Sequence, residues 1–169
     1  MTLDELNRLD RAAFVSFLGG VYEQSPWVAE QAWIRRPFRH VAALHKAMVA
    51  FMRAAPREWK LELIRAHAEL AGRQLREGRL SRIAAEEQKS AGLDQCSAEE
   101  FDRFDALNEA YRAKFGFPFV LAVKGRTRAT VLDLFSRRIE NTPEEELEMA
   151  LRQIEQIAWL RLVEMLATE

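Results

Sequence analysis

The chain has 169 residues, of which 49% are hydrophobic and 30% charged, a balance that is ordinary for one soluble globular domain and short for two. The formal net charge of −1 gives no reason to expect nucleic acid or an anionic membrane as a partner. The single cysteine, Cys96, excludes an internal disulfide and a thiolate metal site, and no apolar run approaches the roughly 20 residues of a membrane helix.

Helix start signals recur along the chain, and no segment alternates with the period of two that is typical of strands. Thr2-x-x-Glu5 and Ser97-x-x-Glu100 match the capping-box pattern, and Thr142-Pro-Glu-Glu145 adds a proline at the first helical position. The acidic start is unlike a secretory or transit peptide, so we expect a cytoplasmic protein. Apolar residues spaced by three and four predict helices within residues 3–18, 27–33, 40–54, 56–66, 80–90, 97–115, 127–139 and 142–166. We therefore expect an all-α, single-domain bundle of about eight helices over residues 1–169.

One short apolar segment, Phe117–Val123, interrupts this helical pattern. Gly116 can take the left-handed conformation that ends a helix, and Pro118 prevents the helix from resuming. The run that follows is apolar, extended and closed by Gly125. If it is buried, its backbone N–H and C=O groups must find partners, and a small polar ligand can be one of them.

Three polar residues share a helical face with core residues. Glu87 occupies a stripe position where Leu or Ile is expected, Arg161 interrupts the apolar stripe of the last helix, and His67 lies at or just past a helix end, on the face of Leu63 and Ile64. Burying one charged side chain costs roughly several kcal/mol unless the charge is paired or the residue serves a function. These residues are candidates for a site.

Structural interpretations stand beside this one. Glu87 and Arg161 can form a buried ion pair while His67 bonds a loop carbonyl, or Arg161 can extend to solvent. His40 and His45 are five residues apart, which does not align two metal ligands on a helix, and we expect no metal site. Ser25 is expected to cap a helix that starts near Trp27, with the Trp27 side chain in the core, and Asn108 is expected to bond neighbouring backbone.

Seven pieces of the sequence, in order, resemble the 2-oxo-4-hydroxy-4-carboxy-5-ureidoimidazoline (OHCU) decarboxylases of urate breakdown. The resemblance extends from Leu6-Asn7 to Arg161-Leu162. Its pieces are Leu18-Gly with Glu23-x-Ser-Pro-Trp27, Arg36-Pro-Phe38, His67-x-x-Leu70-Ala-Gly72, Glu87-Gln88 with Ala91-Gly-Leu93, Leu107-Asn108 with Tyr111, Phe115 to Gly125, and Ile157-Ala with Arg161-Leu162.

The resemblance implies a cofactor-independent carboxy-lyase that forms (S)-allantoin and CO2 and assembles as a homodimer. It implies that His67 is the catalytic acid/base and that Glu87 assists it. It further implies a substrate pocket lined by Ala68, Ala84, Glu87, Gln88 and Arg161, with backbone amides of Phe119, Val120, Leu121, Ala122 and Val123 holding the polar edge of the substrate ring.

The chain departs from the family pattern at two of these positions. Ala68 stands where the family usually has proline, and Ala84 stands where it often has serine; Ser81, one turn earlier, is a possible replacement for that hydroxyl. Two other readings therefore stay open: a cofactor-free enzyme acting on a related ureido or imidazoline acid, and a non-catalytic helical interaction module.

Overall fold

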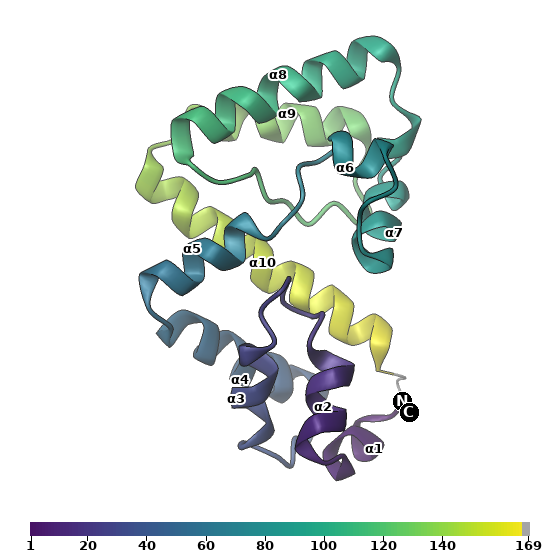
Figure 1. Cartoon of the computed structure of the whole chain (residues 1–169), viewed down its shortest axis with the longest axis vertical. Coiled ribbons are helices and arrows are strands. Elements are labelled where there is room, and N and C mark those ends of the chain that lie inside the picture. The colour runs from purple at the N-terminus through teal and green to yellow at the C-terminus, as the bar shows by residue number, and fades with distance from the viewer. Residues whose placement is uncertain (167–169) are drawn as a thin grey trace. The chain divides into compact units, whose positions relative to one another are not determined.

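The computed structural model describes residues 1–166, in which ten α-helices and one 3₁₀ helix are joined by turns and loops (Figure 1). No strand occurs in this part of the chain, so the all-α prediction is confirmed. The elements are α1 Leu3–Arg8, α2 Arg11–Leu18, α3 Trp27–Trp33, α4 Val41–Ala54, α5 Arg57–Arg65, α6 Arg73–Arg76, α7 Arg82–Ser90, η1 Leu93–Gln95, α8 Ala98–Phe115, α9 Arg128–Arg138 and α10 Pro143–Met165.

The chain divides into two compact units. Unit 1 consists of Met1–Ala66 and the chain from Ile154 onward, and so contains α1 to α5 and the later part of α10. Helix α3 packs against both α2 and α4. The side chains of this core lie on the apolar faces of the helices and are almost completely buried: Leu6, Phe14, Leu18, Val28, Leu44, Met48, Met52, Leu63 and Ile64.

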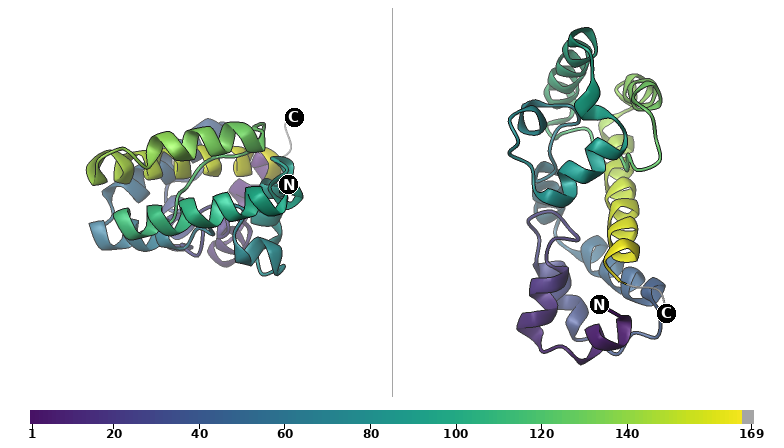
Figure 2. Two further views of the ribbon diagram at one scale, coloured as in Figure 1. Left: turned by 90° about the horizontal axis from the view of Figure 1, so that it is seen from above. Right: turned by 90° about the vertical axis from the view of Figure 1, so that its right-hand side faces the viewer.

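Unit 2 consists of His67–Gln153 and contains α6, α7, η1, α8, α9 and the first part of α10. Helices α8 and α9 lie side by side, as the left view of Figure 2 shows, and α7 packs against η1. The core of this unit is aromatic. Phe104, Tyr111, Phe119 and Phe135 are all buried, and the rings of Phe119 and Phe135 stack with centroids 3.9 Å apart.

Local sequence signals account for most helix ends. The two capping boxes at Thr2 and Ser97 form with both reciprocal hydrogen bonds. Thr142 caps α10 in the same way, because its N–H donates to Glu145 and its hydroxyl accepts from the Glu145 N–H. Gly116 ends α8 at φ 77°, the left-handed conformation expected of it.

The sequence-based helix assignment differs from the structure in two respects. The first predicted helix is two helices, because the Asp10 carboxylate accepts the N–H of Ala13 at 2.8 Å and starts α2 anew. The short elements α6 and η1 were not predicted, since four and three residues are too few to show a helical period.

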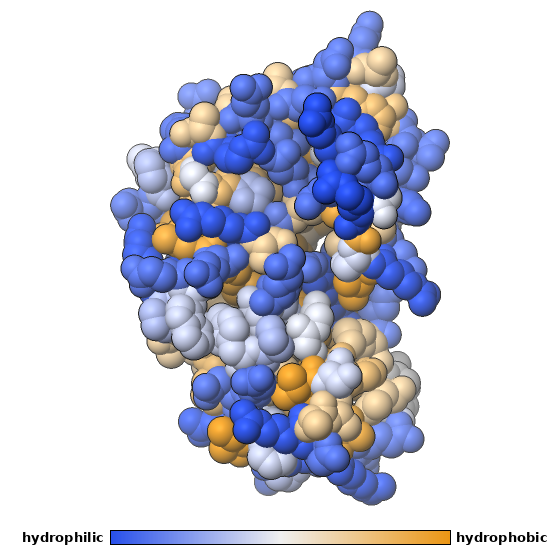
Figure 3. Space-filling model, in the orientation of Figure 1, coloured by the Kyte–Doolittle hydropathy of each residue, from blue (hydrophilic) through white to orange (hydrophobic). Residues whose placement is uncertain are grey.

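Hydrophilic side chains dominate the face of the molecule drawn in Figure 3, with hydrophobic residues scattered among them. Within residues 1–166, no helix combines the length and the apolar character needed to cross a membrane.

Candidate functional site

His67 lies in the loop that follows α5, two residues beyond its last helical residue, and is half-buried together with Ala68 and Glu69. The loop then turns at Leu70 and Ala71, both of which are buried. Ala71 has φ 50°, a left-handed conformation that an alanine rarely adopts. The position of His67 past the helix end agrees with the prediction, and the strained turn behind it was not predicted.

Helix α7 carries the next group of predicted site residues. Gln88 is its buried residue, whereas Glu87 and Ala84 are half-buried. The stripe predicted from the sequence therefore centres one residue later than expected, with Glu87 at its edge. The hydroxyl of Ser81 accepts the N–H of Ala84 at 3.3 Å and caps the helix, which gives this serine a structural role.

Two buried side-chain amides bind the backbone of the loop after His67. Gln88 accepts the N–H of Ala71 at 2.9 Å and donates to the carbonyl of Glu69 at 3.2 Å. Asn108, on α8, donates to the carbonyl of Leu70 at 3.0 Å. The prediction that Asn108 bonds neighbouring backbone is confirmed.

The segment Phe119–Val123 has no regular secondary structure, and each of its five residues is at least 95% buried. Part of its backbone is bonded within the protein. The N–H of Ala122 donates to Gln153 at 3.0 Å, Arg138 donates to the carbonyl of Val120 at 2.6 Å, and Arg126 donates to the carbonyls of Ala122 and Val123. Among residues 1–166, these bonds do not engage the N–H groups of Leu121 and Val123.

A buried ionic network supports this segment. Arg138 and Glu146 form an ion pair whose side chains are 8% and 0% exposed, and the hydroxyl of Tyr111 donates to Glu146 at 2.5 Å. The Arg138 guanidinium also lies over the ring of Phe119, 4.3 Å from its centroid. Burial alone would raise the pKa of Glu146, but the hydrogen bonds from Arg138 and Tyr111 outweigh burial and the pKa is lowered.

Arg161 belongs to unit 1 and is 2% exposed, so its predicted place on the buried stripe is correct. Its guanidinium forms an ion pair with Glu23 at 2.8 Å and donates to the carbonyl of Gly20 at 2.9 Å. A structural ion pair of the kind weighed above is thus present, with Glu23 as a carboxylate that the sequence did not assign to it.

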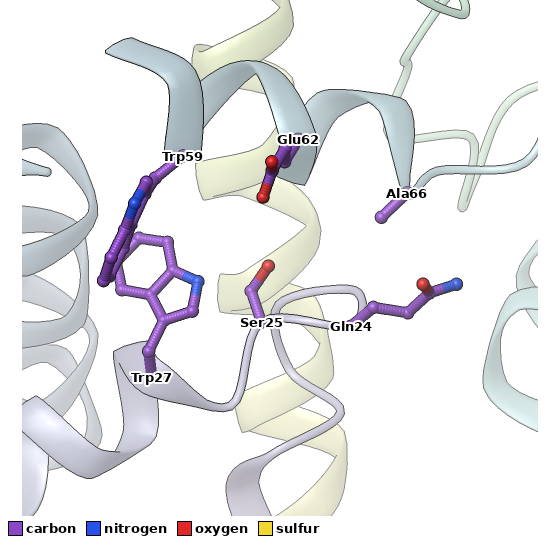
Figure 4. A pocket seen from close by; sticks show the side chains of 6 residues that line it. All are labelled: Gln24, Ser25, Trp27, Trp59, Glu62 and Ala66. Atoms are coloured by element: carbon purple, nitrogen blue, oxygen red, sulfur yellow. The ribbon is translucent and has the colours of Figure 1, made fainter. Parts of the chain in front are cut away.

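Unit 1 also contains a cavity of about 450 Å³ next to the end of α5. Figure 4 shows Glu62 and Ser25 pointing toward one another across it, with Trp27 and Trp59 on one side. The two indoles meet edge to face at 5.2 Å. Ser25 was expected to cap α3, and this prediction was wrong, because the Ser25 hydroxyl donates to the carbonyl of Glu23. Trp27 lines the cavity and is only half-buried, so its assignment to the core was also wrong.

The structure places nearly all of the predicted site in unit 2. His67, Ala68, Ala84, Glu87, Gln88 and the residues from Phe119 to Val123 all belong to it, and Arg161 is the exception.

Sequence reasoning missed Arg138 and Glu146. Both lie at helical spacing from core residues, three residues after Phe135 and four before Ala150, so the rule that singled out Glu87 could have found them. Within residues 1–166, no group of three or more His, Cys, Asp or Glu side chains is arranged to hold a metal ion.

Known proteins that are similar to this chain belong to one enzyme family. The family model described as OHCU decarboxylase matches residues 7–163. A 2-oxo-4-hydroxy-4-carboxy-5-ureidoimidazoline decarboxylase of Haloferax volcanii is 41% identical over 100% of this chain and 98% of its own length. The enzyme of the same name from Mus musculus is 38% identical over 98% of this chain and 93% of its own.

Two solved structures share the fold. The crystal structure of (S)-allantoin synthase superposes with a TM-score of 0.81 at 34% identity and covers 99% of this chain, which spans 55% of that longer chain. The crystal structure of an OHCU decarboxylase in the presence of (S)-allantoin gives a TM-score of 0.69 at 27% identity over 85% of this chain and 93% of its own. The chain belongs to the OHCU decarboxylase family.

Proposed function

We propose that this protein decarboxylates 2-oxo-4-hydroxy-4-carboxy-5-ureidoimidazoline to (S)-allantoin and CO2 in urate degradation, with His67 as the general acid/base. Family membership over residues 7–163 supports the reaction class of carboxy-lyase. The similar structure that was determined in the presence of (S)-allantoin supports the product.

The observation that carries the proposal in this chain is the buried segment Phe119–Val123. It brings main-chain donors into the interior without regular secondary structure, and the hydrogen bonds found among residues 1–166 leave out the N–H groups of Leu121 and Val123. Buried N–H groups are rarely without a partner in native proteins. A flat ring with carbonyl oxygens and ring nitrogens supplies the missing acceptors.

The substrate provides its own electron sink, so the chemistry needs no cofactor. When the bond between the ring carbon and the carboxylate breaks, CO2 leaves and the electron pair moves into the adjacent ring C=N bond, whose nitrogen takes up a proton. The hydroxyl on the first carbon is then part of an enol. Loss of the hydroxyl proton and addition of a proton to the neighbouring carbon from one face give (S)-allantoin.

This chemistry assigns a role to each site residue. His67 moves the proton, because an imidazole commonly titrates near neutral pH. Glu87 accepts hydrogen bonds from ureido or ring N–H groups and holds His67 in its active tautomer. Arg161 binds carbonyl or carboxylate oxygens through its planar fork. Phe119–Val123 recognise the ring edge. The pocket walls are Ala68, Ala84 and Gln88.

The test forms the unstable substrate in situ from urate with urate oxidase and 5-hydroxyisourate hydrolase, and follows optical activity by circular dichroism. The wild-type chain is expected to accelerate formation of (S)-allantoin. His67→Asn is expected to lose about 10²-fold or more in kcat, the size of a general acid–base contribution, while far-UV spectra stay unchanged. Decay to racemic product at the uncatalysed rate with the wild-type chain would reject the reaction. A folded His67→Asn with undiminished kcat would reject the role of His67 alone.

Assembly as a homodimer, which the sequence resemblance supports, and a cytoplasmic location complete the proposal. Light scattering during size-exclusion chromatography measures the first, with twice the chain mass of 19.5 kDa expected. Fractionation of the source cells measures the second.

A further inference from the structure

We propose that Gln88 and Asn108 are positioning residues: their buried side-chain amides hold the backbone of residues 69–71 and thereby fix where His67 stands relative to Glu87. Gln88 has been assigned only to the substrate pocket, and Asn108 has no role in the chemistry described above. The proposal rests on the proposed function, because it explains how the loop that carries the acid/base is held.

Two consecutive peptide units of the loop, between Glu69 and Ala71, are held through three backbone groups by side chains rather than by secondary structure. The Glu69 carbonyl accepts from Gln88, the Leu70 carbonyl accepts from Asn108, and the Ala71 N–H donates to Gln88. Gln88 and Asn108 are 4% and 3% exposed, so water competes little for these bonds. His67 is two residues before the first of these peptide units.

The conformation of Ala71 shows that the loop needs to be held. Its φ of 50° is strained for a residue with a Cβ, although Gly72 follows it directly and has an ordinary φ of −86°. Glycine at position 72 avoids a close contact instead: a Cβ there would lie 3.1 Å from the Cβ of Glu69. Strain of this kind persists only where surrounding contacts impose it, and the two amides supply those contacts.

The side-chain amide of Asn108 is only half satisfied by the described part of the chain. Its carboxamide oxygen is buried and has no hydrogen-bond partner among residues 1–166. An unsatisfied buried acceptor is unfavourable, whereas the Leu70 carbonyl would lose its Asn108 donor if leucine stood here. The donor half of the amide, which binds the Leu70 carbonyl, is therefore the half through which Asn108 acts on the loop.

Gln88 connects the loop to the residue with which His67 is proposed to act. It follows Glu87 directly on α7, and its amide reaches the loop on both sides of Leu70. A shift of the loop therefore changes the separation of His67 from α7. Misplacement of a catalytic group by about 1 Å can lower a rate by about 10²-fold.

The deciding variant is Asn108→Leu, because Asn108 has no proposed contact with substrate. We expect kcat to fall by about ten- to a hundredfold with KM changed less than about threefold, as for a misplaced catalytic group. The imidazole signals of His67 in NMR spectra are expected to shift or broaden, while those of His40 and His45 stay in place; the chain has only these three histidines. Gln88→Met is expected to shift the same His67 signals.

Asn7→Leu is the matched control. Asn7 also bridges backbone with its amide, donating to the Phe38 carbonyl and accepting the Phe38 N–H at 2.8 Å each, but it belongs to unit 1. Its loss should lower Tm and leave kcat and the His67 signals unchanged. If Asn108→Leu does not fold, Asn108→Ala replaces it, since alanine also removes the donor to Leu70 and adds no bulk at this buried position.

The outcomes separate this proposal from the proposed function. Folded Asn108→Leu and Gln88→Met with wild-type His67 signals would overturn the positioning role, whatever the reaction. Shifted His67 signals together with an undiminished kcat for His67→Asn would support the holding of the loop and reject His67 as the acid/base.

Discussion

Arg138 binds Glu146 through two of its nitrogens in a site almost sealed from solvent. Its Nε donates to both carboxylate oxygens at 3.1 Å, and its Nη2 donates to Oε2 at 2.8 Å. The remaining Nη1 donates to the Val120 carbonyl at 2.6 Å. The ion pair is therefore attached to the backbone of the proposed substrate-binding segment, and its loss should affect both stability and binding.

Arg138→Met is expected to lower the free energy of unfolding by about 3–5 kcal/mol, because it leaves a buried carboxylate without its cation. Urea denaturation at pH 7 measures this. Arg137→Met is the control on the same helix: Arg137 pairs with Asp133 in an exposed i,i+4 contact, which is worth about 0.5 kcal/mol. If both variants lose a similar free energy of unfolding, the buried ion pair contributes no more to stability than the exposed one.

Stability should fall in acid partly because of Glu146. The pKa of this carboxyl is lowered in the folded state from its ordinary value of 4.5, so the ionised form is favoured by folding. That contribution is complete above pH 4.5 and is lost as the pH falls through the lowered folded value. The stability difference between wild type and Glu146→Gln should therefore shrink as the pH is reduced below 4.5. A constant difference in urea denaturation between pH 7 and pH 3 would contradict the shift.

Arg161→Lys separates substrate binding from structure. Lysine keeps the charge but lacks the planar fork, and a hydrogen bond to a charged group is worth about 1.5–3 kcal/mol, so KM should rise about tenfold with a smaller change in kcat. Glu23→Gln is the companion variant, since it weakens the ion pair with Arg161 and is not expected to touch substrate. This variant should lower Tm and change KM by less than about twofold. If both variants lower Tm and neither raises KM more than about twofold, Arg161 is purely structural.

The two departures from the family pattern can be reversed. Ala84→Ser restores a hydroxyl on the half-buried face of α7, and one added hydrogen bond, worth about 0.5–1.5 kcal/mol, should raise kcat/KM severalfold for the proposed substrate. Ala68→Pro should stiffen the loop beside His67. A panel of related ureido acids provides the comparison. If the native chain prefers another acid and Ala84→Ser reverses the preference, then this chain acts on a different substrate from the family, and position 84 determines the choice.

Periodicity and capping signals were sufficient for much of the fold. They predicted α3 over its exact residues and the starts of α8 and α10, because these depend on contacts within a few residues of the chain. They joined α1 to α2, because the apolar spacing continues past Asp10. Burial of Arg161 was foreseen for the same local reason. Its partner Glu23 was not, since 138 residues separate them and only the folded chain brings them together.

Only those features of the candidate site that depend on local helical spacing could be predicted from the sequence. His67 and Glu87 were predicted as site residues because they share a helical face with core residues, a property that a single helix displays. The structure places His67 past the helix end and leaves both side chains half-buried. A backbone contact of Asn108 was predicted, but its partner was not, since Asn108 lies 38 residues from Leu70 and only the folded chain brings them together. The contact of Gln88 with the same loop was not predicted. The roles of the site residues in the reaction stay predictions that the experiments above decide.

The irregular segment Phe119–Val123 has a consequence for mutagenesis. If its main-chain N–H groups bind the substrate, alanine substitutions remove packing but leave every donor in place, so an alanine scan would record losses of stability and little change in recognition. Proline is the only natural residue that deletes an N–H. Homologues can also vary these side chains while keeping the same donors, so the segment can drift in sequence without drifting in specificity. Recognition by main-chain donors depends on the path of the chain rather than on the identity of its side chains.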